Sequence, residues 1–430
     1  MPEVTLTANQ PLALGARPRA GAPTLSHLHV PGSVLRGALA EAWIIEHGEP
    51  SRAPDLRPAF IALFERGVRF GPLFAPGSTV VPLSVLRCKY LPTSACTGVW
   101  CDEAYNEVPA ACPECAGPLV YGRGDVEFVS GSAGPPTTRT TRVALTADGT
   151  AKENHLYTRE AIAPYGADGA PRRFSGRIIG GGDWLLGERR LFVGGRRSVA
   201  GVADYLAEPD TPGAPDAEGD RLIIRLMSPA VLVDHAGRPS SEPDTNLLSE
   251  LLDAQVNIGR TWIRRTRVGG WHAVADLPKP DDHAVTAGST YELLLDNQPN
   301  PAAVQRLLDR GIGLRRAEGL GWIEAARWHP PEPPAAPAGA KPDAVAQGMS
   351  EMITNLPGDQ SRWLLGELRR NLTHLAAGGA RNTELLRRPR MEVLTGRQRR
   401  YLTLLLMEQT PSRIAAVADA LEARIRGVKT

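Results

Sequence analysis

Four of the five cysteines are clustered, and their spacing is the most specific chemical signal in the sequence. Four thiolates complete the tetrahedral coordination of a zinc ion and leave no position open for water, so such a site is structural and not catalytic. The second pair lies in a Cys-Pro-x-Cys-x-Gly turn, whose backbone amides can donate to the sulfurs. The pattern predicts one structural zinc ion bound by Cys96, Cys101, Cys112 and Cys115. The alternative is a set of unrelated reduced thiols, and for Cys88 we adopt that interpretation.

A second candidate site is a loop of four glycines and two adjacent arginines between an expected helix and an expected strand. It reads Gly-Ile-Gly-Leu-Arg-Arg-Ala-Glu-Gly-Leu-Gly over residues 311–321. Glycine allows a positive φ and a close approach of the backbone to a ligand. The planar guanidinium of arginine matches phosphate oxygens in a bidentate way. The loop therefore suits contact with a phosphate backbone, and its alternative interpretation is a helix C-cap followed by a turn.

Basic and glycine-rich segments recur elsewhere in the chain. They lie at residues 175–182, 192–198 and 260–267, and the second of them contains Arg196, Arg197 and Ser198. Each segment alone is a weak signal, because arginine is common at the ends of strands. Together with the loop at 311–321 they suggest one extended anionic ligand that is contacted by backbone and arginine groups.

A helix is expected to begin near the amino terminus, with Ser33 as its N-cap and Gly48 at its end. The residues that repeat on its apolar face are Leu35, Leu39 and Trp43. A glycine inside a helix costs about 1 kcal/mol relative to alanine. Gly37 therefore predicts that a neighbouring element or a ligand comes close to the first turns.

No motif typical of a catalytic site is present. The sequence has no P-loop, no Gly-x-Ser-x-Gly elbow and no His-Glu-x-x-His pattern. His27 or His29 could serve as the general base of an RNA-cleaving site, and an ordinary hydrogen-bonded histidine is the alternative. The segment Asp234–Gly237 is better explained as a turn between strands than as an acid–base pair.

The remaining pattern predicts an α+β protein with antiparallel sheets. Strands are expected at residues 4–7, 222–227 and 290–295, and helices at 245–255 and 301–310. The last helix has Asn300 as its cap and Pro301 at its first position.

A proline-rich stretch at residues 329–343 predicts a semi-rigid linker. Residues 344–430 show helical periodicity and few strand signals, which predicts an all-helical C-terminal module. Seven arginines lie between Arg381 and Arg400. Such a run is either a solvated face or a surface that contacts RNA or an acidic protein.

The bulk properties limit the classes of function. Forty-nine basic and 47 acidic residues give a net charge of +2, so any nucleic-acid contact must be local. No run approaches the roughly 18 apolar residues that a membrane span requires. The absence of a signal segment and the clustered cysteines lead us to expect a cytoplasmic protein without membrane contact.

Two of these motifs resemble those of a known group. Residues 30–39, Val-Pro-Gly-Ser-Val-Leu-Arg-Gly-Ala-Leu, resemble the N-terminal motif of the RAMP superfamily of CRISPR-associated proteins, and residues 311–321 resemble its C-terminal glycine-rich loop. The order of the segments at 191–198, 226–234 and 277–279 is similar to that of the large Csx-ten-type (Cas-five-like) subunit of type III-D effector complexes. The resemblance covers about residues 1–330, and the cysteine cluster and the helical tail lie outside the shared motifs.

The resemblance implies a fold of two ferredoxin-like, RRM-related domains. We accordingly expect a first domain at residues 1–145 with a zinc-binding insertion at about 88–120, a second at 146–328, a linker at 329–343 and a helical module at 344–430. The RNA-binding residues that the resemblance implies are Gly32, Ser33, Arg36, Gly37, Gly311, Gly313, Arg315, Arg316, Gly319 and Gly321.

The resemblance also implies a function. The chain would be a non-catalytic subunit of a type III CRISPR effector complex in antiviral defence, which caps the 5′ handle of the guide (cr)RNA. Its partners would be that RNA, the large polymerase-like subunit and the backbone RAMP subunits, and the target sequence would be recognised by guide pairing. Two alternatives remain: a guide-RNA processing endoribonuclease that uses His27 or His29, and a protein adaptor without RNA contact.

Overall fold

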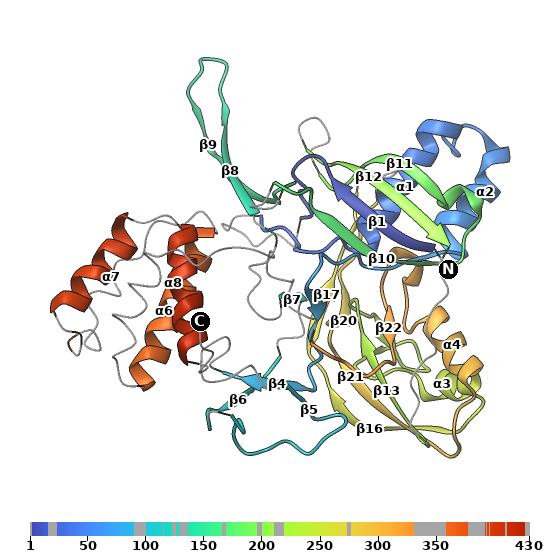
Figure 1. Cartoon of the computed structure of the whole chain (residues 1–430). Helices are drawn as coiled ribbons and strands as arrows, with labels where there is room; N and C mark the ends of the chain where they lie inside the picture. The colour runs from blue at the N-terminus through green and yellow to red at the C-terminus, as the bar shows by residue number, and fades with distance from the viewer. Residues whose placement is uncertain are drawn as a thin grey trace.

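The computed structural model describes most of the chain as a mixed α/β protein with antiparallel sheets, as predicted (Figure 1). The described residues are 2–15, 24–89, 100–114, 116–122, 126–128, 135, 137–165, 169–195, 200–209, 219–272, 277–330, 358–376, 392, 394, 396–408 and 411–425.

The first sheet has five strands and is built around the amino-terminal strand. In spatial order its strands are β11 (Gly187–Phe192), β12 (Val202–Pro209), β1 (Pro2–Ala8), β10 (Arg173–Ile179) and β2 (Arg69–Phe70). Strand β1 alternates as the sequence predicts: Val4, Leu6 and Ala8 are fully buried, whereas their neighbours face away from the core. This sheet therefore presents one apolar face to a helical layer.

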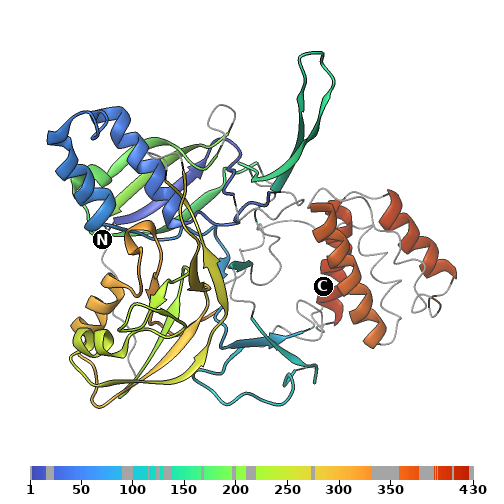
Figure 2. The same cartoon turned by 180° about the vertical axis from the view of Figure 1, so that it is seen from behind.

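That helical layer lies on one face of the first sheet (Figure 2). It consists of α1 (Gly32–His47), the 3-10 turn η1 (Pro54–Leu56), α2 (Arg57–Ile61) and the π-helical turn η2 (Ala62–Arg66). The three apolar residues predicted for the buried face of α1 are all within the first core, and Gly48 ends the helix as predicted. The N-cap differs from the prediction and is discussed with the site below.

The second sheet has four strands with two helices. Its spatial order is β16 (Val256–Trp262), β21 (Thr290–Leu295), β13 (Arg221–Leu226) and β22 (Ile323–Glu324). Helices α3 (Thr245–Leu252) and α4 (Pro301–Arg310) pack on the same core as these strands. The caps of α4 agree with the sequence: the Asn300 side chain accepts from the amide of Ala302, and Pro301 is the first helical residue.

The boundary expected at residues 145/146 does not coincide with these sheets. Strands β10, β11 and β12 follow that boundary, yet all three belong to the first sheet: β10 and β12 pair with β1, and β11 pairs with β12. The second sheet begins only at β13. The first unit therefore extends to β12, because a long insertion separates β2 from β10 in the sequence while the two strands remain paired in space.

The insertion contains small antiparallel elements. Strands β3 (Ser78–Val80) and β7 (Val126–Phe128) form one pair, and β5 (Trp100–Asp102), β4 (Val85–Cys88) and β6 (Leu119–Tyr121) form a three-stranded sheet. We call residues 78–128 the cysteine lobe. A hairpin of β8 (Thr137–Leu145) and β9 (Ala151–Ile162) follows and projects from the body of the molecule (Figures 1 and 2).

The cysteine lobe packs on the second sheet through aromatic and charged side chains. The Glu103 carboxylate accepts from the indole of Trp262 at 2.8 Å and from the Tyr121 hydroxyl at 3.0 Å. The ring centroids of Trp100 and Trp328 are 5.2 Å apart. The lobe is thereby joined to residues that lie far along the chain.

The second unit carries further short elements. These are β14 (Leu232–Val233), β15 (Pro239–Ser240), β17 (Arg265–Val268), β18 (Trp271–His272), β19 (Leu277–Pro278), β20 (Asp282–Val285) and the 3-10 turn η4 (Arg316–Glu318); a 3-10 turn η3 (Asp183–Leu185) precedes β11 in the first unit. The Asp234–Gly237 segment is the predicted turn: it joins β14 to β15, and the Asp234 carboxylate accepts from the amides of Ala236 and Arg238.

Three helices follow near the carboxyl end: α6 (Gly358–Ala376), α7 (Gly396–Glu408) and α8 (Pro411–Ile425). They share an apolar core that includes Leu365, Leu402 and Leu421. Apart from residues 329–330, the expected linker lies outside the described residues, as does nearly all of the basic stretch from 381 to 395. In the described part of the chain, no helix is long and apolar enough to cross a membrane.

Candidate nucleic-acid interface

The start of α1 differs from the prediction in a way that leaves backbone donors free. Pro31, not Ser33, occupies the N-cap position, and it has no side-chain hydrogen bond to the helix. Its carbonyl accepts from the amides of Val34 and Leu35. Within the described residues, the amides of Gly32 and Ser33 have no acceptor. A helix start of this kind offers N–H groups and a partial positive charge to an anion.

The two glycine-containing motifs meet at this helix start. A Cβ atom added to Gly319 would lie 2.8 Å from the Cα of Gly32 and 2.9 Å from the Phe70 carbonyl oxygen. A Cβ atom added to Gly32 would overlap that same carbonyl oxygen. Both positions therefore require glycine because two backbones pack directly on each other. The motif residues 32–37 and 311–321, distant in the sequence, form one feature in space.

The loop at 311–321 contains both the helix C-cap and the turn that its sequence predicts. Gly311 is the C-cap of α4, with its amide donating to the Leu307 carbonyl at 2.8 Å. Gly313, Gly319 and Gly321 all have positive φ angles, between 64° and 83°. The loop then closes on itself, because the amide of Ile312 donates to the carbonyl of Gly321. It is a helix cap and also a tightly folded turn whose backbone reaches α1.

The Arg315 side chain is held inside the protein. Its guanidinium donates to Asp282 at 2.8 Å, to Glu318 at 2.9 Å and to the Gly269 carbonyl at 3.0 Å. Its backbone adopts the left-handed conformation, with a φ of 56°. Burial raises the pKa of Glu318, but hydrogen bonds from Arg315 and Lys279 outweigh it, so the pKa lies below its ordinary value. Arg315 thus fixes the shape of the loop, and its fork does not face a ligand.

Arg36 has a similar positioning role. Its Nε donates to the Phe64 carbonyl at 2.6 Å, and its terminal nitrogen pairs with Glu65 at 2.7 Å. These contacts fasten α1 to η2. Gly37, in contrast, is exposed, and an added Cβ atom would meet no other atom within 4 Å. No described element approaches Gly37, so a close packing contact within the described residues does not explain this glycine.

A buried arginine that the sequence did not reveal joins the two units. Arg69 in β2 donates to the carbonyls of Leu308 and Asp309 at 3.0 and 2.6 Å, and to that of Gly321 at 3.2 Å. Its guanidinium stacks over Trp322 at 4.7 Å. Burial and the nearby Arg316 lower the pKa of Arg69 to about 10, with Asp309 acting in the opposite sense, so Arg69 stays charged at neutral pH.

The side chains of three other arginines around this junction have no hydrogen-bond or ion-pair partner in the described part of the chain. Arg316 is half-buried in η4, and burial together with Arg310 lowers its pKa. Arg310 is exposed at the end of α4, and Arg66 is exposed at the end of η2, a turn that contacts η4. Uncompensated like charges in one place are the electrostatic signature of an anion site. Arg66, Arg310 and Arg316, with the free amides of α1, make up what we call the junction site.

The remaining predicted RNA contacts, Arg196, Arg197 and Ser198, lie outside the described residues. No local pattern marked Arg66, Arg69 or Arg310, because their grouping depends on how η2, β2 and α4 meet. The signal that could have suggested Arg310 is its place at a helix end directly before the glycine-rich loop.

The described cysteines partly test whether the lobe fits a metal ion. Cys101 lies on β5, and Cys112 begins a tight turn in which its amide and carbonyl bond Gly117 and Ala116, each at 2.8 Å. Ala116 has a φ of 53°, the conformation of a narrow knuckle. Cys88 is fully buried beside Cys112 and Leu119. Cys96 and Cys115 lie outside the described residues, and no group of three metal-binding side chains occurs among those described.

The two candidate catalytic histidines lie close together before α1. The ring centroids of His27 and His29 are 5.2 Å apart, and the ring of His29 is 5.6 Å from that of Phe74. Burial, followed by the charge of His27, lowers the pKa of His29 to about 3. A general base is most effective when its pKa lies near the working pH. His29 is neutral at pH 7 but a weak base, so its environment is poorly suited to catalysis.

Comparison with known proteins gives the class of the chain. Residues 139–321 match the family model described as CRISPR-associated protein (Cas_Cmr3), a span that includes β8 to η4 and the glycine-rich loop. The match supports a CRISPR-associated RAMP protein, the class that the two end motifs indicate, and it includes the second of these motifs. The matched model is that of Cmr3, and the more specific resemblance to the Csx-ten type stays a prediction. No curated protein sequence matches the chain.

Solved structures of related class share low overall similarity with the chain. A chain of the type III-B Cmr-beta complex bound to cognate target RNA and AMPPnP is 14% identical, with a TM-score of 0.36 over 67% of this chain and 86% of that one. A chain of the Csm3-Csm4 subcomplex of the type III-A interference complex is 10% identical, with a TM-score of 0.33 over 76% and 100%. The CRISPR-associated protein Cas6 is 11% identical, with a TM-score of 0.31 over 76% and 98%.

Proposed function

We propose that the chain is a non-catalytic, RNA-binding subunit of a type III CRISPR effector complex that caps the 5′ handle of the guide RNA. The family match supports the class of complex. The observation that carries the RNA contact is the packing of Gly319 on Gly32, which brings the free amides of α1 beside Arg66, Arg310 and Arg316. The partners of the chain are then the guide RNA, the large polymerase-like subunit and the backbone RAMP subunits.

Strand order supports the proposal that each unit is ferredoxin-like. In the second unit the order along the chain is β13, α3, β16, β21, α4, β22, and the spatial order is β22-β13-β21-β16. This is the split β-α-β arrangement, in which the first strand lies between the third and the fourth. The first unit repeats the spatial order as β12-β1-β10-β2, with η3 and β11 in the place of its second helix.

Removing one cation of the junction site tests the RNA contact. We expect Arg316→Ala to weaken guide binding about tenfold and to reduce the slope of log affinity against log salt by about 1, because one phosphate contact is lost. The measurement is binding of repeat-derived RNA by the purified complex over a series of salt concentrations.

The matched control is the adjacent residue. Arg315→Ala should lower the melting temperature, because it leaves Asp282 and Glu318 without their partner. The slope of log affinity against log salt should be the same for this variant as for the wild type. An Arg316→Ala variant with an unchanged salt slope would show that the junction site does not bind the guide.

The alternative function, an endoribonuclease that processes guide RNA, makes an opposite prediction. If His27 or His29 were the base, the double His→Ala variant would lose cleavage of a repeat hairpin. We expect no cleavage by the wild-type protein and unchanged RNA binding by the variant, since the pKa of His29 is about 3. Cleavage that disappears with the two histidines would favour the enzyme.

We also propose that the cysteine lobe binds one structural zinc ion through Cys96, Cys101, Cys112 and Cys115. The knuckle geometry at Cys112 supports it, and the ion would fold the lobe without taking part in a reaction. Elemental analysis should find about one zinc per chain. Cys112→Ser should abolish it and lower the melting temperature, while Cys88→Ser should retain the metal. Full zinc content in Cys112→Ser would contradict the ligand set.

A further inference from the structure

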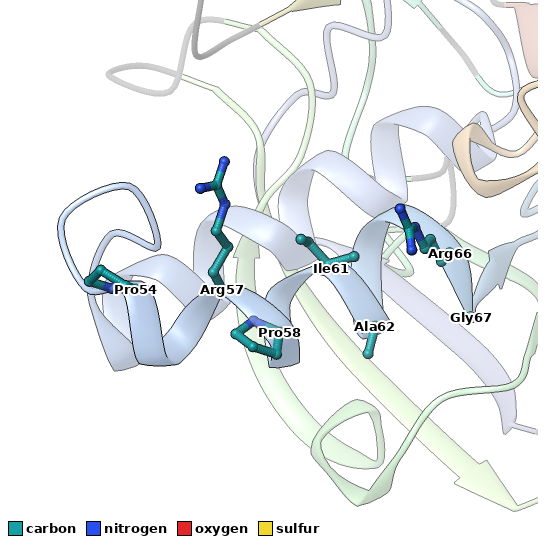
Figure 3. A pocket seen from close by; sticks show the side chains of 7 residues that line it. All are labelled: Pro54, Arg57, Pro58, Ile61, Ala62, Arg66 and Gly67. Carbon is teal, nitrogen blue, oxygen red and sulfur yellow. The ribbon is translucent and has the colours of Figure 1, made fainter.

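A shallow hollow runs along η1, α2 and η2, and it shares only Arg66 with the junction site. Its volume is about 630 Å³. The apolar residues that line it are Pro54, Pro58, Ile61 and Ala62. Arg57 and Arg66 flank Pro58, Ile61 and Ala62, and Pro54 lies beyond Arg57, as Figure 3 shows.

The two arginines give this hollow an uncompensated positive charge. Both residues are exposed, and neither guanidinium has a hydrogen-bond or ion-pair partner in the described part of the chain. No carboxylate lines the hollow. Of the acidic residues along the helical run and the loop before it, Glu65 and Glu49 are paired with Arg36 and Arg52, and Asp55 in η1 lies beside Pro54 without lining the hollow. A ligand of this surface is therefore expected to bring its own negative charge.

The backbone beneath the hollow is also unusual. The amide of Gly67 donates to the carbonyl of Ala62 at 3.1 Å, five residues earlier, which is the hydrogen bond of a π turn. Such turns are rare and occur frequently at functional sites. Both residues of this bond line the hollow, so the irregular turn shapes the surface itself.

The lining favours a protein ligand over a nucleic acid. Single-stranded RNA is held by aromatic side chains on which its bases stack, and the hollow is lined by proline and aliphatic residues without an aromatic ring. Proline and isoleucine between two arginines instead match an amphipathic segment with an aliphatic anchor and flanking carboxylates.

We propose that this hollow binds an acidic amphipathic segment of a neighbouring protein subunit, with an aliphatic side chain over Pro58 and Ile61 and carboxylates paired with Arg57 and Arg66. The inference rests on the proposed function only in that the chain works within a multisubunit complex. Arg66 then lies between the guide RNA and the protein segment, because η2 contacts η4 at the junction site. Arg57 belongs to the docking surface alone.

A photoreactive residue in the complete complex tests this assignment. Benzoylphenylalanine replaces Ala59, which is exposed beside Pro58, and the crosslinked peptides are identified by mass spectrometry. We expect a crosslink to an acid-rich segment of another protein subunit. Arg57→Glu should reduce its yield about tenfold, as for the loss of about 1.4 kcal/mol. Arg52→Glu, the same charge change at a side chain that is 82% exposed outside the hollow, should leave the yield unchanged.

Guide RNA binding is measured on the same preparations and separates the two proposals. Arg57→Glu should retain RNA affinity while it loses the crosslink. A crosslink to RNA, a crosslink to protein that Arg57→Glu does not weaken, or no crosslink above that of a probe at Ile45 on α1 would overturn the docking surface. Loss of RNA binding in the wild-type complex would instead count against the proposed function alone.

Discussion

Replacing Gly32 with alanine is expected to lower the free energy of unfolding by roughly 3 kcal/mol and to abolish guide binding. The new Cβ atom would overlap the Phe70 carbonyl oxygen and lie 3.1 Å from the Cα of Gly319. Both neighbours are backbone, so neither can rotate away. Relief requires the start of α1 to move away from β2 and from the glycine-rich loop, which would separate the amides of α1 from Arg316. Denaturant unfolding and RNA binding measure the two effects.

Gly37→Ala is the matched control for this prediction. The residue lies in the same helix, and an added Cβ atom would meet nothing within 4 Å. Alanine in a helix is about 1 kcal/mol more favourable than glycine, so this variant should be slightly more stable than the wild type. Weaker guide binding by a more stable Gly37→Ala protein would show that RNA covers this turn. If Gly32→Ala were as stable as Gly37→Ala, the packing of the two motifs would be refuted.

Arg69→Leu is expected to have the second large effect, a loss of about 3 kcal/mol. The substitution leaves the carbonyls of Leu308 and Asp309 without the Arg69 donor, and it removes one of two donors from the carbonyl of Gly321, in a region that is largely closed to water. It also removes the charge that lies at the carboxyl end of α4, where a cation is favourable. Hydrogen exchange at the amides of Ile312 and Gly321 should speed up, because the first closes the loop next to Arg69 and the second holds the loop to the Pro229 carbonyl.

Arg310→Leu removes a charge from the same helix end without removing a buried bond. Arg310 is exposed and donates to no described acceptor, so the cost should be below about 1 kcal/mol. Guide binding should fall, because Arg310 belongs to the junction site. Equal destabilisation by Arg69→Leu and Arg310→Leu would mean that the buried bonds of Arg69 contribute little.

Elements with local signals could be predicted from the sequence, and contacts between units could not. Helix α4 was predictable because Asn300 and Pro301 mark its start, and β21 because a short segment rich in leucine lies between turns. The cap at Ser33 was wrong by two positions: Pro31 supplies the extended backbone, and the Ser33 side chain is exposed. Arg315 and Arg316 are identical in type, and only the left-handed backbone at Arg315 turns its side chain toward Asp282.

The domain boundary illustrates a second limit. Strand β10 pairs with β1 and β2, although the cysteine lobe and the β8–β9 hairpin lie between β2 and β10 in the sequence. Periodicity within a window of a dozen residues reports that a strand exists but carries no information about its partner. The predicted boundary at residues 145/146 therefore separates strands that belong to the same first sheet.

The position of the Arg69 bonds has a consequence for synthesis. The carbonyls that Arg69 binds lie 239 to 252 residues further along the chain. Domains fold from the amino terminus as they leave the ribosome, so the first unit emerges with a buried arginine that has no acceptor until the glycine-rich loop has also emerged. A chain that stops before residue 321 would hold β1 and α1 but not the closed junction. Only chains that extend through residue 321 can therefore form the closed junction between the two units.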